Sequence, residues 1–277
     1  MDRPQKKIRI LSLQYHCYPD EVGGAWGLTY EINKRLVERG HKVYQITCKS
    51  VENQPSQEVI DGIQYHRISL RESKGMLSLW NTIRKKVKAI LNLESIHLIH
   101  IHNPLIGFLA LLQPSLWKVP KVYHFHSSWF DEERINAVGN AQISLALKFR
   151  LEMIRIMEWV CYRFSRTLLF LSEYSKNRFK DYYSLSNPDL VIIPGGVDLN
   201  KFHPLKPEEN KKAIREKLNL KKDVPLILTV RRLEERMGLE NLILAVEILL
   251  KKNPAKSFQL AMVGKGSLKQ RLENLIA

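Results

Sequence analysis

The sequence lacks the features that would place it in a membrane or in a disulfide-stabilised class. None of its 277 residues lies in an apolar run that approaches the roughly 20 residues needed to span a bilayer. No signal pattern precedes the first predicted strand. The three cysteines, Cys17, Cys48 and Cys161, are far apart and have no metal-ligand spacing. We therefore expect reduced thiols and a cytoplasmic location.

Two common nucleotide-binding motifs are also missing. Gly23 and Gly24 follow the first predicted strand but do not form G-x-G-x-x-G, and no acidic residue closes the second strand, which argues against a dinucleotide dehydrogenase. The glycines in Gly264–Ser267 do not have Walker spacing, which argues against a P-loop. Paired glycines before a helix still let backbone amides approach an anion, although a tight entry turn is the alternative.

Acidic residues are scarce relative to basic ones. The chain has 28 Asp and Glu against 44 Lys and Arg, which gives a formal net charge of +16. This excess favours a polyanionic partner: nucleic acid, an anionic membrane surface or a phosphorylated substrate. The charge alone does not choose among the three.

Apolar strands alternate with amphipathic helices through residues 1–198. The predicted strands are 8–13, 43–47, 63–68, 97–102, 121–125, 167–171 and 190–193. The predicted helices are 25–39, 77–93, 105–117, 141–164 and one that begins at Ser172. This alternation predicts an α/β fold with a doubly wound parallel sheet, as in Rossmann-like domains.

The composition changes after Asp198. Residues 199–223 are rich in lysine and proline, with one polar helix at about 207–218, and we interpret them as a linker. A second series follows in residues 224–277, with strands at 226–230 and 258–263 and helices at 240–252 and 267–276. This series is well below the roughly 100–150 residues of a usual domain. We expect it to be part of a second Rossmann-like domain.

Two arginines stand at the carboxyl end of the strand 226–230. Arg231 and Arg232 are followed by a short loop, and Gly238 opens an amphipathic helix. Ligands of parallel sheets bind at the carboxyl ends of strands, where guanidinium groups beside a helix N-terminus suit a phosphate or pyrophosphate. A pair of solvated surface arginines is the alternative.

Two predicted strands, consecutive along the chain, end in histidines. Alternation places His100 and His102 on one face of their strand and His124 and His126 on one face of theirs. No nearby carboxylate or cysteine completes a zinc site, so we expect no metal. His102 and His126 should reach the ligand-binding edge of the sheet. His126 suits a bond to a substrate hydroxyl or an acid/base role, and a structural histidine is the alternative.

Several segments together resemble the family-4 retaining glycosyltransferases of the GT-B fold. They are the loop with Gly23 and Gly24, HFHSSW at 124–129, IPGGVDLNKFHP at 193–204 and VRRLEERMGLENLI at 230–243. The segment from Met157 to Phe179 adds a helix, a strand and a Ser-Glu helix start similar to those of the family. The resemblance covers nearly the whole chain.

The resemblance implies transfer of a sugar from a nucleotide-diphosphate sugar, with retention at the anomeric carbon. The acceptor would be a glycan, a lipid-linked molecule or a small molecule, and no metal would be needed, in keeping with the lack of a D-x-D motif. The catalytic residues would be His126 and Arg232. The donor-binding residues would be Gly23, Gly24, Gly195, Gly196, Arg231, Arg236 and Gly264, and the acceptor-side residues His102, Asn103 and Ser127. Glu158, Ser172 and Glu173 also match the family pattern, and we interpret them as structural.

The sequence departs from the family pattern at two points. Met237 stands where the family usually has a lysine, so Arg231 or Arg236 would have to replace that cation. The family's paired-glutamate motif would follow Ala277, and we interpret the chain as truncated within its second domain. The sequence leaves open whether residues 1–277 are active without that motif.

Two other classes remain alternatives. One is an epimerase of nucleotide sugars on the same architecture, which would need an acid/base pair that the resemblance does not supply. The other is a basic α/β protein that binds nucleic acid, although the basic residues are dispersed and lack a stacking platform. Contact with an anionic membrane is a further expectation. In residues 82–90 the basic side chains of Arg84, Lys85, Lys86 and Lys88 lie among apolar ones.

Overall fold

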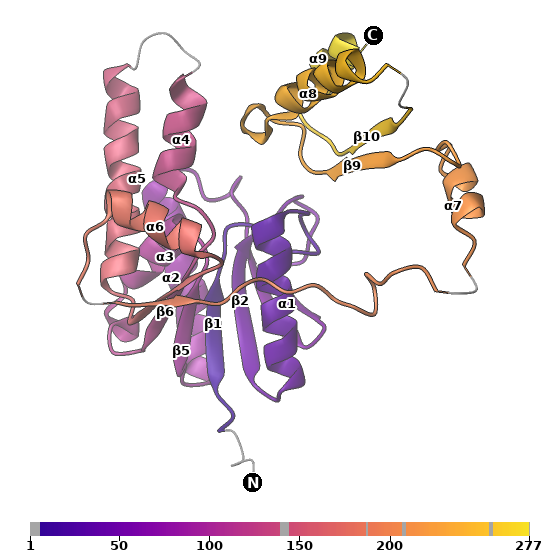
Figure 1. The fold of residues 1–277 in the computed structure, drawn as a ribbon. Helices are drawn as coiled ribbons and strands as arrows, with labels where there is room; N and C mark the ends of the chain where they lie inside the picture. The colour runs from indigo at the N-terminus through magenta and orange to yellow at the C-terminus, as the bar shows by residue number, and fades with distance from the viewer. Residues whose placement is uncertain (1–5, 139–143, 187, 207–208, 255–256, 277) are drawn as a thin grey trace. The chain divides into compact units, whose positions relative to one another are not determined.

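The chain folds into two compact units. A computed structural model describes residues 6–138, 144–186, 188–206, 209–254 and 257–276. The first unit is Met1–Gly196 and the second is Val197–Ala277, and each is described by itself (Figure 1). The second unit takes in the segment 199–223 that the sequence suggested as a linker, and the first unit ends two residues before the predicted end of the first domain.

An eight-stranded sheet organises the described part of the first unit. Its spatial order is β3-β4-β2-β1-β5-β6-β7-β8, with a crossover between β4 and β5. The strands are β1 (Arg9–Leu13), β2 (Lys42–Cys48), β3 (Gln57–Ile60), β4 (Ile63–Ile68), β5 (Leu98–Ile101), β6 (Lys121–Phe125), β7 (Thr167–Phe170) and β8 (Asp189–Ile192). Seven of them are parallel, which confirms the predicted doubly wound α/β sheet.

The edge strand β3 is antiparallel, which the sequence analysis missed. Two residues, Asp61 and Gly62, join it to β4, and both have positive φ (48° and 77°). An Asp-Gly pair with left-handed backbone is the typical two-residue hairpin connection, because its twist matches that of the strands. The expectation of an all-parallel sheet was therefore wrong at this edge.

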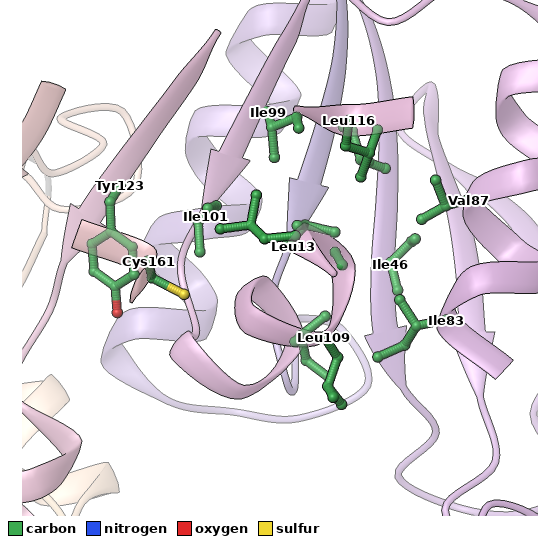
Figure 2. Close-up of a cluster of buried hydrophobic side chains, with 14 of the residues drawn as sticks. Leu13, Ile46, Ile83, Val87, Ile99, Ile101, Leu109, Leu116, Tyr123 and Cys161 are labelled. Carbon is green, nitrogen blue, oxygen red and sulfur yellow. The ribbon is translucent and has the colours of Figure 1, made fainter. Parts of the chain in front are cut away.

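Helices cover both faces of the sheet. They are α1 (Gly24–Glu38), α2 (Met76–Leu93), α3 (Pro104–Leu111), α4 (Trp129–Val138), α5 (Leu145–Arg163) and α6 (Glu173–Tyr182). The α1 side chains Leu36 and Val37 pack with Ile10 of β1, whereas Leu11 and Leu13 point to the opposite face. That opposite face holds the main core, in which side chains of α2, α3 and α5 meet the strands (Figure 2). Successive strand residues alternate between the two faces of the sheet. The odd-numbered and even-numbered positions of a strand therefore pack against different helix layers.

Two helical expectations need correction. The predicted helix 105–117 is divided into α3, which ends at Leu111, and a 3₁₀ turn, Pro114–Leu116. Pro114 lacks an amide hydrogen and keeps Gln113 in the β region (φ −95°, ψ 117°), so the α-helix cannot continue. The helix α4 was not predicted. The start of the predicted helix 141–164 falls partly outside the described residues, and α5 covers the rest.

The α2 segment does not offer its apolar side to a membrane. Ile83, Val87 and Ile90 are fully buried in the core, so the apolar residues of 82–90 serve packing rather than lipid contact. Lys86 is half-buried and donates to the backbone oxygen of Ser56 at 3.3 Å. The other basic residues of the segment, Arg84, Lys85 and Lys88, are exposed. Among the described residues, no helix is both long and apolar enough to cross a bilayer.

The second unit is built on two parallel strands. They are β9 (Leu226–Val230) and β10 (Gln259–Val263), and its helices are α7 (Lys211–Lys217), α8 (Leu239–Lys252) and α9 (Lys269–Ile276). Its core contains Leu233, Leu239, Ile243, Leu268 and Leu272. This strand–helix–strand–helix series confirms the predicted Rossmann-like pattern of the second unit.

Candidate functional site

The α1 N-terminus lies at the carboxyl edge of the sheet in the first unit. Gly23 is its N-cap in an extended conformation (φ −173°, ψ 157°), and no side chain caps the helix. The first turn carries no acidic side chain, so no carboxylate of this turn offsets the partial positive charge of its free amide groups. A Cβ on Gly24 would meet nothing within 4 Å, whereas one on Gly23 would lie 2.6 Å from the Trp26 ring. The geometry suits an anion bound by backbone amides.

A buried ion pair holds the loop that leads to this helix. Arg67 of β4 donates from Nε and an Nη to the two oxygens of Asp20, at 2.6 and 2.8 Å. The two side chains are 1% and 3% exposed. A second carboxylate, that of Glu58 on β3, lies 2.8 Å from the same guanidinium. Sequence reasoning missed this support, because 47 residues separate Arg67 from Asp20 and nothing local links them.

Four histidine rings form a stacked cluster on the face of the sheet that α1 covers. His100 pairs in register with Ser12, whose hydroxyl accepts from Asn33 of α1 at 3.1 Å. The rings of His124 and His126 are stacked, with centroids 4.6 Å apart and planes at 4°. Nδ1 of His102 lies 3.2 Å from Nε2 of His126. The structure therefore brings together the two histidines that the sequence directed to the sheet edge.

Burial keeps this cluster uncharged. Desolvation lowers the pKa of His126 to about 3, with a further contribution from the charges of His124 and His100. Desolvation lowers the pKa of His124 to about 4 and that of His102 well below its usual value. The imidazoles are consequently neutral near pH 7, each with one donor and one acceptor nitrogen.

Glu158 of α5 accepts hydrogen bonds from the loop after β6 and holds that loop in place. This carboxylate of α5 is fully buried and accepts from the Trp129 amide at 2.6 Å and from the Ser128 hydroxyl at 3.1 Å. Tyr183 also donates to it. Burial raises the pKa of Glu158 against these hydrogen bonds. The buried carboxylate therefore supports the 126–129 loop, which agrees with its interpretation as structural.

Other acceptor-side and loop residues have more varied surroundings. Asn103 is the N-cap of α3, and its side-chain oxygen accepts from the Ile106 amide at 3.1 Å. Ser127 is exposed directly after His126. Gly195 and Gly196 are exposed in the segment after β8, and a Cβ on either would meet nothing within 4 Å. Asn103 thus has a local structural task, while the other three leave open backbone or side-chain surface.

The arginines of the second unit differ in their contacts. Both Arg231 and Arg232 are exposed at the carboxyl end of β9. An Nη of Arg231 lies 3.0 Å from Sδ of Met237, so this guanidinium contacts the residue at which the resemblance implied a lysine. Within the described residues Arg232 forms no ion pair. The backbone at Arg236 is in a 3₁₀ turn, Glu235–Met237, and its side chain lies outside the described part of the structure.

Two close backbone approaches explain the glycines after β10. A Cβ on Gly264 would lie 1.9 Å from the Arg231 carbonyl oxygen, and one on Gly266 would lie 2.1 Å from that of Leu233. Backbone hydrogen bonds connect the loop after β9 to the loop after β10. The Arg231 amide donates to the Val263 carbonyl at 3.0 Å, and the Leu233 amide donates to the Lys265 carbonyl at 2.9 Å. Gly264 therefore has a structural reason to be glycine, beside the donor-binding role that the resemblance implied.

The Glu234 side chain also links these two loops. It accepts from the Ser267 hydroxyl at 2.8 Å and the Ser267 amide at 3.2 Å. These bonds, and then the charge of Arg232, lower the pKa of Glu234. The loop that carries both arginines is thus fixed by backbone and side-chain bonds, while the Arg232 guanidinium itself extends into solvent.

Comparison with known proteins shows the family of the chain. The sequence profile described as Glycosyltransferase Family 4 matches residues 22–201, and the one described as Glycosyl transferases group 1 matches residues 210–277. A D-inositol 3-phosphate glycosyltransferase of Kineococcus radiotolerans is 24% identical over 95% of this chain and 62% of its own length. A GDP-mannose-dependent monoacylated alpha-(1-6)-phosphatidylinositol monomannoside mannosyltransferase of Corynebacterium glutamicum is 35% identical over 39% of this chain and 27% of its own length.

The fold has a solved counterpart. The sucrose-phosphate synthase of Thermosynechococcus elongatus matches 98% of this chain and 72% of its own, with a TM-score of 0.68 and 18% identity. The chain spans less than two thirds of the length of the two curated relatives above. One profile covers the first unit almost completely and the other covers most of the second. The chain belongs to Glycosyltransferase Family 4.

Proposed function

We propose that the protein transfers a sugar from a nucleoside-diphosphate sugar to an acceptor hydroxyl, with retention of anomeric configuration. The acceptor oxygen forms a bond to the anomeric carbon, the bond from that carbon to the diphosphate oxygen breaks, and the nucleoside diphosphate and a proton leave. Membership of the family supports the reaction class. The single structural observation that carries it is Arg232, an exposed guanidinium at the end of β9 with no ion-pair partner among the described residues.

Arg232 would bind the leaving diphosphate. Negative charge grows on this group as the glycosidic bond breaks, so a fixed cation stabilises the transition state more than the ground state. The loop that carries Arg232 is held by the Leu233–Lys265 and Glu234–Ser267 bonds, which position it in advance. The uncapped α1 amides of the first unit are a second anion site of the same chemical kind. We propose that donor binding needs no divalent metal.

His126 would contact the transferred sugar. Its ring stacks on His124 and its Nε2 faces Nδ1 of His102, so its orientation is set before any substrate binds. Burial keeps it neutral, which suits a hydrogen bond to a sugar hydroxyl rather than a charge interaction. Ser127 would complete the acceptor side, and His102 would act there through its contact with His126.

A lipid-linked acceptor in the cytoplasm fits the surface of the first unit best. The mannosyltransferase relative acts on an acylated phosphatidylinositol mannoside, as its name states. Leu145, Phe149 and Ile156 of α5 are 83%, 70% and 49% exposed and lie along one stripe of the helix. The stripe, together with the exposed basic residues of α2, would form a peripheral contact with an anionic membrane.

The test is transfer from a panel of nucleotide sugars to lipid extracts and to soluble acceptors, using the natural full-length protein. Incorporation of labelled sugar should depend on Arg232 and His126, and added Mg²⁺ or Mn²⁺ should not raise turnover. The matched control is His203→Ala, because His203 is an exposed histidine of the second unit. Activity that survives both Arg232→Ala and His126→Ala would overturn the proposal.

A further inference from the structure

Four nitrogen atoms in the histidine cluster have no hydrogen-bond partner in the described structure. They are Nε2 of His100, Nε2 of His102 and both ring nitrogens of His124. These residues are 6%, 4% and 3% exposed. An unpaired buried polar atom destabilises the folded state, and native proteins rarely leave several together without a bound group. One of these nitrogens in each ring can offer a lone pair, so their concentration in one place points to a ligand that accepts three lone pairs, and the second nitrogen of His124 then carries the proton.

The three residues converge on one point. His100 and His102 are two residues apart on β5, and their ring centroids are 3.9 Å apart. His100 pairs with Val122 in the parallel register, so the next outward pair sets His102 beside His124. One ring nitrogen from each of the three lies within 4.8 Å of the others. Nitrogens bound to one tetrahedral ion with bonds of about 2.0–2.1 Å lie roughly 3.3 Å apart, so small side-chain rotations close the set.

We propose that His100, His102 and His124 bind one zinc ion. Three imidazoles with an open fourth position are a known ligand set for this ion, and a carboxylate or thiolate is not required. The expectation from the sequence that no metal binds rested on the lack of such a residue.

Protonation does not oppose this site. Desolvation lowers the pKa of His100 to about 3, and the repulsion between two protonated rings, His100 and His124, adds to the shift. The imidazoles therefore need not release protons at neutral pH before they bind a cation. The described residues around the point carry no charge on the sheet face itself: Ser12 and Gln14 are the neutral neighbours that β1 contributes.

The ion would also fix the orientation of His126. If His102 binds zinc through Nε2, its Nδ1 must carry the proton and donates to Nε2 of His126, 3.2 Å away. His126 is then the tautomer protonated on Nδ1. This part of the inference rests on the proposed function, in which His126 contacts the sugar, whereas zinc binding does not. The ion is a positioning element and is separate from the donor diphosphate.

Metal content of the untagged protein tests the site directly. After removal of metal with a chelator and dialysis against one equivalent of zinc chloride, elemental analysis should find about one zinc per chain. Replacement by Co²⁺ should give the strong visible absorption of a four-coordinate ion. Retention of less than about a tenth of an equivalent, or the weak spectrum of a six-coordinate ion, would overturn the proposal whatever the activity is.

Substitutions locate the ion. His100→Gln and His124→Gln should each lower zinc affinity at least tenfold, while His203→Gln, at an exposed histidine, should not. Zinc should raise the thermal midpoint of the wild type and of His203→Gln, and it should not raise that of His100→Gln. Equal zinc affinity in all four proteins would assign the metal to another site. If a histidine variant does not fold, the stoichiometry and cobalt spectrum of the wild type still decide the question.

A spectroscopic measurement separates binding from positioning. Nitrogen NMR of the histidine side chains should show His126 in the Nδ1-protonated form when zinc is bound, with a mixture of tautomers after the metal is removed. An unchanged His126 tautomer would remove the positioning role. Loss of transferase activity plays no part in either result, so failure of the proposed reaction would leave this test intact.

Discussion

Two guanidinium nitrogens of Arg67 donate to the Asp20 carboxylate at 2.6 and 2.8 Å, and both side chains are almost fully buried. This pair connects the β1–α1 loop to β4. The loop ends at Gly23, where the α1 amides begin. A buried, two-pronged pair of this kind fixes geometry as well as charge, because the guanidinium fork matches the carboxylate. The position of the open helix terminus therefore depends on a residue in a strand that takes no part in the chemistry.

Removal of one member of this pair should destabilise the protein strongly. Asp20→Ala leaves the buried guanidinium with Glu58 as its remaining carboxylate among the described residues, and we expect a loss of about 3–5 kcal/mol in the free energy of unfolding. Urea denaturation measures it. Glu31→Ala, which breaks an exposed pair with Arg35, is the control and should cost under about 0.5 kcal/mol. Equal effects at the two positions would show that the Asp20 pair is no more than a surface contact.

Arg232→Ala should lower turnover by tens- to hundreds-fold in the natural full-length protein. Loss of a charge-assisted contact to a leaving diphosphate is worth on the order of 2–4 kcal/mol. Arg232→Lys should recover only part of this loss, because the charge remains and the fork geometry does not. Arg231→Ala should do much less, since that guanidinium rests on Met237. Initial rates at saturating donor measure the effect, and equal losses at both arginines would indicate diffuse charge.

Stability should fall in acid in part through His66. Desolvation, and then the charge of Lys86, lowers the pKa of this buried β4 residue to about 4. The unfolded chain takes up the proton at a pKa of about 6.5. Above that pH the residue has no effect, and between about 6.5 and 4 it lowers the free energy of unfolding by up to roughly 1.4 kcal/mol per pH unit, after which the effect levels off.

The His66 contribution can be separated from those of the other histidines. Urea midpoints of the wild type and of His66→Gln should converge as the pH falls from 6.5 to 4, because the variant no longer takes up this proton. The comparison is made in the presence of a chelator. Parallel curves over this range would contradict the assigned pKa direction.

Binding to anionic vesicles should depend on charge at α2 and on apolar side chains at α5. Replacement of Arg84, Lys85 and Lys88 by Glu should weaken binding, since each basic residue near such a surface is worth about 1 kcal/mol. Phe149→Ser with Ile156→Ser should also weaken it, because both side chains are exposed. Flotation with phosphatidylglycerol vesicles measures both effects. Neutral vesicles are the control, and unchanged binding by both variants would remove these helices from the membrane contact.

Local sequence determined most of the elements. The apolar run Leu226–Val230, the 3.6-residue stripe of α2 and the histidine alternation each express the geometry of one strand or helix, which is readable without neighbours. The order of strands and helices then restricts the fold to a doubly wound sheet, because parallel crossovers have one hand. The Asp61-Gly62 hairpin and Pro114 were equally local signals, and they were overlooked.

Tertiary structure alone decided how residues distant in the sequence meet. The Arg67–Asp20 pair, the approach of the Arg231 carbonyl to Gly264 and the carboxylate of Glu158 behind Trp129 each join segments about 30 or more residues apart. Sequence periodicity gives the face of a side chain but not the register between strands, and register brings His102 of β5 beside His124 of β6. Burial then decided chemistry, because the desolvation that keeps the histidines neutral exists only once the sheet has formed.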